Sequence, residues 1–348
     1  MESPDSFENL PNSFKDEEAL EEFMTRPSDA LIRDLEKLPG DIMVLGVGGK
    51  MGPTLARLAK RAAPAKNVIG VARFSDPNVR HKLEDWGVET LTCDLLDRES
   101  VAKLPQIKNI VYMAGRKFGT AGAAGLTWAM NAYVPAIVGE NFSKSRIVAL
   151  SSGCVYPYVN VLHQGATEDQ PAEPPPGDYA MSCVGREQIF QYFSGVSNTP
   201  GRLIRLNYAI DMRYGVLHDV AKKVLNEEPI DLKMGHVNVI WQGDANAQIL
   251  RSLLHCTTPT SPLNISGPEI ISIRALATEF GKQLDKDVQF RGEEAETAWI
   301  TNTSQAVRLF GYPLISLPQM VSWVREWVSE GKSTLGKATH YEVRNGSY

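Results

Sequence analysis

The chain of 348 residues has a formal net charge of −5, with 43% hydrophobic and 22% charged residues. At roughly 150 residues per domain, this length predicts about two domains with an ample core. The acidic balance argues against nucleic acid or an anionic membrane as a partner, and no apolar run approaches the roughly eighteen residues of a membrane span.

Cysteines and histidines lack the spacing of a metal site. Cys93, Cys154, Cys183 and Cys256 are far apart and form no C-x-x-C pair, which predicts neither a zinc site nor a disulfide framework. The six histidines show no metal-ligand spacing. Because the N-terminus is acidic and carries no apolar run, we expect no signal peptide and a cytoplasmic protein with reduced cysteines.

Residues 1–40 differ from the rest of the chain. Four glutamates between Glu17 and Glu22 interleave with Leu20, Phe23 and Met24, and leucines recur near helical spacing from Leu31 onward. This pattern predicts an acidic extension of one or two amphipathic helices, packed on its own domain or on a neighbouring subunit.

From residue 41 the pattern changes to alternating strands and helices. Short apolar runs at 42–45, 68–71, 110–113 and 147–150 are typical of strands buried on both faces of a parallel sheet. Helix-like stretches lie between them, at 53–63, 79–86 and 126–140. The alternation predicts an α/β fold with a doubly wound parallel sheet.

We expect four parts along the chain. They are the extension at 1–40, a dinucleotide-binding domain at 41–206 plus about 236–256, a smaller substrate-binding region at 207–235 plus 257–330, and a C-terminal tail at 331–348.

A glycine-rich loop joins the first predicted strand to the first helix of this unit. Gly46, Gly49 and Gly52 are spaced by two residues, with Lys50 and Met51 before the last glycine. Phosphates bind backbone N–H groups at a helix N-terminus, and glycine allows the close approach. The loop therefore predicts a dinucleotide site.

The end of the second predicted strand indicates which dinucleotide binds. An NAD-specific site has an acidic residue about 20 residues after the glycines, but Ala72-Arg73 stands there. Since Arg73 can pair with a 2′-phosphate, NADP(H) is favoured. NAD(H) remains possible if Asp76 performs the role of the acid.

Further motifs follow the glycine loop in order. Asp94-Leu95, Ala114-Gly115, Asn131 and Ser151-Ser152-x-x-Val155-Tyr156 precede Tyr179. In type, order and spacing, these motifs resemble those of the extended short-chain dehydrogenase/reductase family, also called the NAD-dependent epimerase/dehydratase family, over residues 41–330. The resemblance implies that Asp94, Leu95, Ala114, Gly115, Asn131 and Tyr179 contact the cofactor, beside Gly46, Gly49, Lys50, Met51 and Gly52. It also implies that Ser152 and Tyr179 are catalytic, and that the chain forms a homodimer through helices at about 126–140 and 179–194.

Two departures from the family pattern bear on function. Cys183 stands where the family has the lysine that follows its catalytic tyrosine, so any role of Cys183 in catalysis is doubtful. The stretch Val237–Asp244 lacks the arginine with which nucleotide-sugar members hold the phosphate of their substrate, although His236 is adjacent. This second departure argues against a nucleotide-sugar substrate.

Loss of the lysine leaves three accounts of Tyr179. A free phenol has a pKa of about 10, and the lysine ammonium would favour its ionised form. We prefer the account in which neutral Tyr179 donates a proton during NADPH-dependent reduction of a carbonyl that Ser152 polarises. Alternatively, Arg186 or Lys117 supplies the missing charge, or the fold binds cofactor without efficient turnover.

The substrate pocket should be completed by the segment after the predicted strand that contains Arg205 and by the C-terminal third of the chain. We expect Cys154, Tyr208, Asp211, Arg213 and Trp241 to line this pocket. Arg213 would bind a carboxylate or hydroxyls of the substrate. The alternative is that the segment around Arg213 is a surface loop with ordinary charges. The sequence thus predicts an NADP(H)-dependent oxidoreductase or epimerase acting on a sugar or related small polyhydroxy carbonyl compound rather than a nucleotide sugar. The alternative is a catalytically impaired sensor or partner protein.

Overall fold

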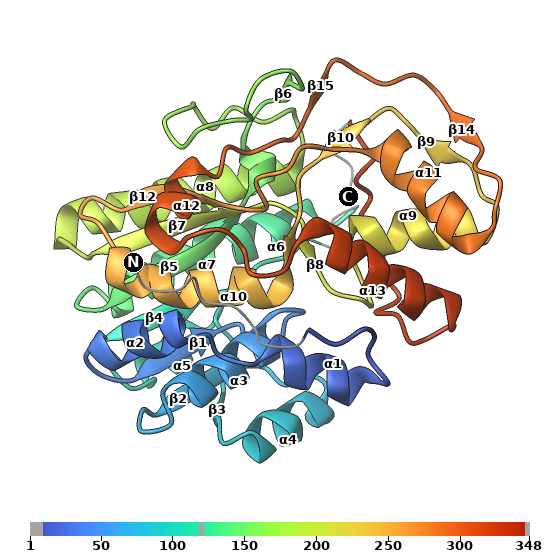
Figure 1. Cartoon of the computed structure of the whole chain (residues 1–348). Helices are drawn as coiled ribbons and strands as arrows, with labels where there is room; N and C mark the ends of the chain where they lie inside the picture. The colour runs from blue at the N-terminus through green and yellow to red at the C-terminus, as the bar shows by residue number, and fades with distance from the viewer. Residues whose placement is uncertain (1–9, 118–121, 345–348) are drawn as a thin grey trace.

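A seven-stranded parallel sheet forms the centre of the larger part of the protein (Figure 1). The computed structural model describes residues 10–117 and 122–344. Every neighbouring pair in the sheet is parallel. In spatial order the strands are β12 (Ser261–Ile265), β7 (Gly201–Leu206), β5 (Arg146–Ser152), β4 (Asn109–Tyr112), β1 (Ile42–Leu45), β2 (Val68–Ala72) and β3 (Glu89–Thr92). This Rossmann-type order confirms the predicted fold class.

Helices cover both faces of the sheet, because its apolar residues point to both sides. Ile42 and Val44 of β1 face one apolar cluster, whereas Met43 and Leu45 face another. The first cluster is completed by α2 (Asp29–Lys37), α3 (Gly52–Ala62), α10 (Gln242–Arg251) and α12 (Ser304–Phe310). The second is completed by α5 (Arg98–Ala102), α7 (Val134–Asn141) and α8 (Asp178–Ser197).

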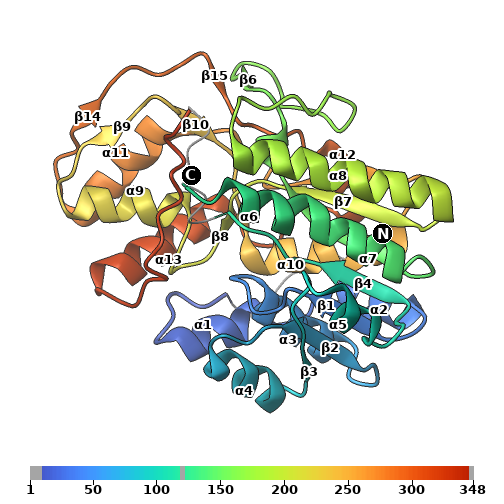
Figure 2. The same cartoon turned by 180° about the vertical axis from the view of Figure 1, so that it is seen from behind.

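The connections carry further short elements. Figure 2 shows α7 and α8 side by side on one face. The additional helical segments are α4 (Pro77–Asp85), α6 (Ala124–Trp128), the π-helix η1 (Ala129–Tyr133), and the 3₁₀ turns η2 (Gly153–Val155) and η3 (Ser252–His255).

A smaller lobe follows β7 and has its own core. Its helices are α9 (Val216–Leu225), α11 (Ile273–Leu284) and α13 (Leu317–Ser329), which pack around Trp241, Trp323 and Trp327. Four two-stranded pairings complete the chain: β8 (Ala209–Ile210) with β11 (Ile240–Trp241), β9 (Ile230–Asp231) with β14 (Phe290–Arg291), β10 (His236–Val237) with β13 (Ile271–Ser272), and β6 (Val159–Asn160) with β15 (Thr297–Ala298).

One segment lies in a different part of the fold from the one expected. Ser261–Ile265, which we assigned to the substrate-binding region, pairs with β7 as the edge strand of the large sheet. Leu263 and Ile265 are fully buried in the core of that sheet. Burial of these two side chains against α10 and α12 places the segment with the dinucleotide-binding part.

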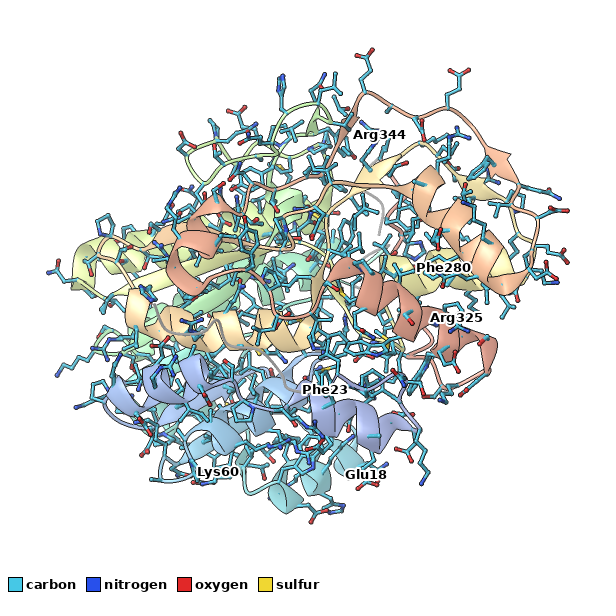
Figure 3. The ribbon with its side chains drawn as sticks, viewed as in Figure 1. Glu18, Phe23, Lys60, Phe280, Arg325 and Arg344 are labelled. Carbon is cyan, nitrogen blue, oxygen red and sulfur yellow. The ribbon has the colours of Figure 1, made fainter. Side chains whose placement is uncertain are left out.

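The N-terminal extension packs on its own chain and contacts both parts of the protein. Helix α1 (Glu17–Met24) is capped at its N-terminus by Asp16, whose side chain accepts a hydrogen bond from the N–H of Ala19. Phe23, labelled in Figure 3, and Phe14 lie against Trp323, with their ring centroids 5.4 Å and 4.9 Å from that of Trp323. The next helix, α2, instead buries Leu31 and Leu35 in the core of the large sheet.

The C-terminal tail is also packed, up to Arg344. Leu335 N donates to the carbonyl of Arg213 at 3.1 Å, and the N–H and hydroxyl of Thr339 donate to Asp219 at 2.8 Å and 2.7 Å. Arg344 Nη1 donates to the carbonyl of Thr297 at 2.6 Å (Figure 3). The tail therefore lies along the smaller lobe.

The described part of the chain contains no helix long and apolar enough to cross a membrane. Within the same residues, no group of three or more His, Cys, Asp and Glu side chains is placed to hold a metal ion. All four cysteines are free thiols.

Replacing Phe23 by alanine tests whether the extension belongs to the core. We expect Phe23→Ala to lower the free energy of unfolding by about 3 kcal/mol, because it removes a buried ring from a packed aromatic cluster. Urea denaturation followed by tryptophan fluorescence measures the change. Leu162→Ala is the control, since that side chain is 90% exposed, and its effect should stay within about 0.5 kcal/mol. Equal effects of the two variants would show that the extension is not part of the core.

Candidate functional site

Two adjoining cavities lie at the carboxyl ends of the central strands. One, of about 360 Å³, reaches toward β2 and β3, and the other, of about 240 Å³, reaches toward β5, β7 and α8. Gly46, Gly49, Met113 and Gly115 line both, so the two cavities form one trough across the point where the strand order reverses. This is where open α/β sheets bind ligands.

The glycine loop is shaped by contacts that exclude side chains. Gly46 has a φ of +87°, and a Cβ there would lie 2.6 Å from the backbone nitrogen of Ala114. A Cβ on Gly52 would lie 2.2 Å from the carbonyl oxygen of Val47. The loop therefore turns tightly into α3, whose N-terminal N–H groups face the trough. This arrangement fits a dinucleotide phosphate.

The larger cavity has the residues expected around the adenosine end of a dinucleotide. Arg73, Asp94, Leu95 and Ala114 all line it. Asp76, the alternative contact for a ribose, is the N-cap of α4, and its Oδ1 accepts from Asn78 N at 2.9 Å. Arg73 is exposed and lines the same cavity, and its guanidinium forms no hydrogen bond or ion pair with the residues that the structure describes.

The smaller cavity brings together Ser152, Cys154 and Tyr179. Ser152 ends β5 and its Oγ accepts from Cys154 N at 3.2 Å. Tyr179 lies in the first turn of α8 and its phenol is hydrogen-bonded to Ser152. Burial raises the pKa of Tyr179 well above its usual value, and the thiols of Cys183 and Cys154 add to the shift. Tyr179 is therefore a neutral phenol with a proton to donate.

Cys183 lies behind the cavity wall rather than in it. Its side chain is fully buried in a small cluster with Val155, Tyr156 and Ala166. Burial raises the pKa of Cys183 to about 11, although the nearby Arg186 opposes the shift. A neutral buried thiol supplies neither charge nor a nucleophile to the site.

Arg186 supplies a permanent positive charge close to Tyr179. It lies two turns later in α8 and lines the smaller cavity. Its Nη1 donates to the carbonyl of Leu150 at 2.8 Å and its Nη2 to Asn131 Oδ1 at 2.7 Å. A Cβ at Gly115 would lie 2.4 Å from Nη2, so glycine makes room for the guanidinium. Lys117, the other cation that we considered, lines the same cavity.

Asn131 holds this arrangement together from outside the cavity. It lies in the π-helix η1, where one extra residue per turn turns a side chain toward the site. Its Oδ1 also accepts from Arg116 N at 2.8 Å, and its Nδ2 donates to Ser182 Oγ at 2.9 Å. The structure thus makes Asn131 a support for Arg186 and for the loop after β4, and does not place it in the lining of the trough.

The expected substrate residues divide into two groups. Cys154 and Tyr208 line the smaller cavity, and Tyr208 has a φ of +41°, a strained value for a side chain of its size. Asp211, Arg213 and Trp241 do not line it.

Arg213 and Trp241 perform structural roles that we did not predict. Arg213 Nη1 lies 2.8 Å and 3.0 Å from the carboxylates of Glu17 and Glu21, and Nη2 lies 2.8 Å from Asp211. Trp241 packs on the aromatic rings of the N-terminal extension. Apart from Asp211, these partners come from residues 14–23, so no local pattern around Arg213 or Trp241 indicates the contacts with the extension.

Sequence reasoning missed where the Lys50 side chain goes. We expected it to contact the cofactor as part of the glycine loop. Its ammonium instead crosses to the smaller lobe, donating to the carbonyl of Ala209 at 3.0 Å and lying 4.2 Å from the centre of the Tyr214 ring. The same cavity is lined by Tyr214 and by Thr339, which belongs to the C-terminal tail. No signal in the sequence connects a residue at 50 with one at 209.

Residues 42–226 match the sequence profile of the NAD dependent epimerase/dehydratase family, which is more than half of the chain. The chain belongs to this family. Members are NAD-dependent epimerases and dehydratases with NAD(P) nucleotide cofactors, as the resemblance of the motifs implies. Among curated proteins, no sequence matches the chain.

Several solved structures have the same fold at low sequence identity. Pal from Bacillus thuringiensis is 18% identical with a TM-score of 0.68, covering 84% of this chain and 100% of its own. The dTDP-glucose 4,6-dehydratase DesIV from Streptomyces venezuelae, with NAD and TYD bound, is 18% identical (TM-score 0.68; 83% and 97% covered). The UDP-glucuronic acid 4-epimerase from Bacillus cereus, with UDP-glucuronic acid and NAD, is 18% identical with a TM-score of 0.68, covering 83% of this chain and 99% of its own. At this identity the likeness supports the fold alone.

Proposed function

We propose that this family member is an NADP(H)-dependent oxidoreductase or epimerase of the extended type, acting on a sugar or related small polyhydroxy carbonyl compound. The observation that carries the proposal is the placement of Ser152 and a half-buried, neutral Tyr179 in the lining of a cavity that continues into the dinucleotide trough.

The residues of the site support carbonyl reduction. The nicotinamide supplies hydride to the carbonyl carbon when the cofactor is bound. Ser152 donates a hydrogen bond to the carbonyl oxygen, and Tyr179 gives that oxygen its proton, so the product is an alcohol. The tyrosinate left behind lies near the guanidinium of Arg186, which favours the charged form. Arg186 thus provides the charge, but not the proton transfer, of the missing lysine.

The dimensions of the cavity support a substrate smaller than a nucleotide sugar. Pockets that bind drug-sized ligands have volumes of roughly 300–1,000 Å³, whereas the part of the trough around Tyr179 has about 240 Å³ and must also admit the nicotinamide. Thr339 of the tail closes one side of it. His236, beside the position of the missing arginine, lies in β10 and does not line the cavity.

The alternative is a protein that binds the cofactor without efficient turnover. Burial of Tyr179 and loss of the lysine favour this alternative, because both oppose ionisation of the phenol. Cofactor binding is common to the two proposals, so only turnover separates them.

Two helical segments on one side of the protein support a homodimer. α6, η1 and α7 lie beside α8 (Figure 2), and together they expose several large apolar side chains. These are Leu126, Trp128, Tyr133, Met181, Tyr192 and Val196. An exposed apolar patch of this kind is typical of a subunit interface, and we propose that a second copy of the chain covers it.

Replacing Tyr179 by phenylalanine tests the proton donor. We expect Tyr179→Phe to slow NADPH-dependent reduction of an active substrate from a panel of sugars and polyhydroxy carbonyl compounds by about 10²–10⁴-fold. NADPH absorbance follows the reaction. Tyr192→Phe is the matched control, since Tyr192 is 63% exposed on the same helix. An unchanged rate in Tyr179→Phe would rule out the catalytic assignment, and absence of turnover in wild-type protein that binds NADPH would support the alternative.

Replacing Arg73 by alanine tests the choice of cofactor. The variant should lose about tenfold or more of its preference for NADPH over NADH, because one charge-assisted contact to the 2′-phosphate is removed. Fluorescence titration gives the two dissociation constants. Arg80→Ala serves as the control, because Arg80 pairs with Glu84 on the same surface. The cofactor proposal fails if Arg73→Ala leaves the ratio unchanged.

A charge on the apolar patch tests the dimer. We expect Tyr192→Glu to be monomeric and the wild-type protein to be dimeric in sedimentation velocity, because the glutamate would be buried without a partner in the interface. Leu162→Glu, on an exposed loop outside these helices, should remain dimeric. A monomeric wild-type protein would contradict the proposal.

A further inference from the structure

The cavity around Tyr179 is strongly asymmetric in charge. Four cationic residues line it: Lys50, Arg116, Lys117 and Arg186. Among the described residues of the lining there is no Asp or Glu. A pocket lined by cations attracts an anion, and low-dielectric walls strengthen the attraction.

Lys50 reaches from the cofactor side of the trough to the smaller lobe. Its backbone belongs to the glycine loop, where phosphates are bound by N–H groups. Its side chain ends at the carbonyl of Ala209 and over the ring of Tyr214, both in the chain that follows β7. The ammonium therefore faces the part of the cavity contributed by the smaller lobe.

The carboxylates nearest to Lys50 are bound by other groups. Asp211 Oδ1 accepts from Arg213 N and Nε at 2.9 Å and 3.0 Å, and its Oδ2 accepts from Arg213 Nη2 at 2.8 Å. Asp219 Oδ2 accepts both hydrogen bonds of Thr339. Lys50 makes no ion pair with any described residue, and its hydrogen bond is to a neutral carbonyl.

We propose that the substrate carries an oxoanion, a carboxylate or a phosphate, and that Lys50 and Lys117 bind this group. The inference rests on the proposed function and narrows its substrate class to acidic sugars or acidic polyhydroxy carbonyl compounds. Lys50 acts here in binding and specificity, while Tyr179 and Ser152 remain at the reacting oxygen. Lys50 and Lys117, which line the cavity, thus bind the anion in place of Arg213, which we had expected to do so.

The lowered pKa of Lys50 is consistent with an anion-binding role. Burial lowers the pKa of Lys50 to about 7; the carboxylates of Asp211 and Asp219 oppose the shift, and the cations of Lys117 and Arg213 add to it. A bound anion would stabilise the ammonium and raise the pKa again. Tyr214, whose ring faces the ammonium, is itself a neutral phenol, because burial raises its pKa.

This coupling gives anion binding a defined pH dependence. Below about pH 7, Lys50 is charged before the anion binds, and the affinity changes little. Above about pH 7, Lys50 must take up a proton when the anion binds. The affinity should then fall by up to about tenfold for each pH unit until the pKa of the complex is reached.

Binding of simple anions to the protein loaded with NADP⁺ tests the inference. The probes are D-gluconate, inorganic phosphate and the neutral polyol sorbitol, measured by calorimetry. We expect at least one anion to bind, and the stronger of the two identifies the substrate group as carboxylate or phosphate. Gluconate serves for the pH series because its carboxylate stays ionised throughout.

Lys50→Met should weaken binding of the anion at least tenfold and leave the affinities for sorbitol and NADP⁺ within about twofold. Lys60→Met is the matched control (Figure 3), because Lys60 of α3 donates only to backbone carbonyls outside the cavity, and it should change none of these values. Lys50→Arg, which stays charged, should retain binding and lose the fall above about pH 7. Thermal unfolding of each variant verifies that it is folded.

Several outcomes would overturn the inference. These are no binding of either anion to the wild-type protein, equal anion affinity in Lys50→Met, or a flat pH profile. A loss of NADP⁺ affinity in Lys50→Met as large as the loss of anion affinity would assign Lys50 to the cofactor instead. Because the measured quantity is an affinity and inorganic phosphate cannot be oxidised or reduced, a protein that binds anions but reduces nothing would contradict only the proposed function. Turnover of neutral sugars without anion binding would contradict only this inference.

Discussion

The parallel register of four strands is the constraint on which the site depends. Leu45 pairs with Tyr112, Tyr112 with Ala149, and Ser152 with Leu206. Strands aligned in this way end at one edge of the sheet, so the segments after β1, β4, β5 and β7 converge there although they are up to 160 residues apart in the chain. A strand running in the opposite direction would remove its segment from the trough. The cofactor loop, the serine and the smaller lobe are thus brought together by backbone hydrogen bonds.

This constraint explains which features could be predicted from the sequence. Strands, glycine loop and motif residues are local patterns, and a parallel sheet fixes where the ends of such strands lie; the fold class and the family were therefore correctly predicted. The positions of Arg213 and Trp241 depend on Glu17, Phe14 and Phe23, which come from an extension outside the family match. Pairings over such separations leave no periodic signal. The contact of the Lys50 side chain with Ala209 could not be predicted either, because the two residues are also far apart in the sequence.

The structure changes the interpretation of Cys183. In the sequence, Cys183 replaces the lysine of the family motif, so the site lacks a positive charge at this position. In the structure, positive charge is present in the same cavity but comes from other positions: Arg186 from the next turns of α8, and Lys50 from the opposite wall. The small thiol fills a closed apolar cluster. The guanidinium is held by a carbonyl and by Asn131, so its position is set by the π-helix as much as by α8.

The packing of the extension has a consequence for biosynthesis. Residues 14–24 are synthesised well before their core partners, Trp241 and Trp323. Even the carbonyl of Pro11 is bound by the indole of Trp323. Most strands of the large sheet precede Trp241 in the chain and can assemble during translation, whereas the aromatic cluster around Phe14 and Phe23 is incomplete until Trp323 has been made. The extension therefore completes its packing after most of the large sheet can already have formed.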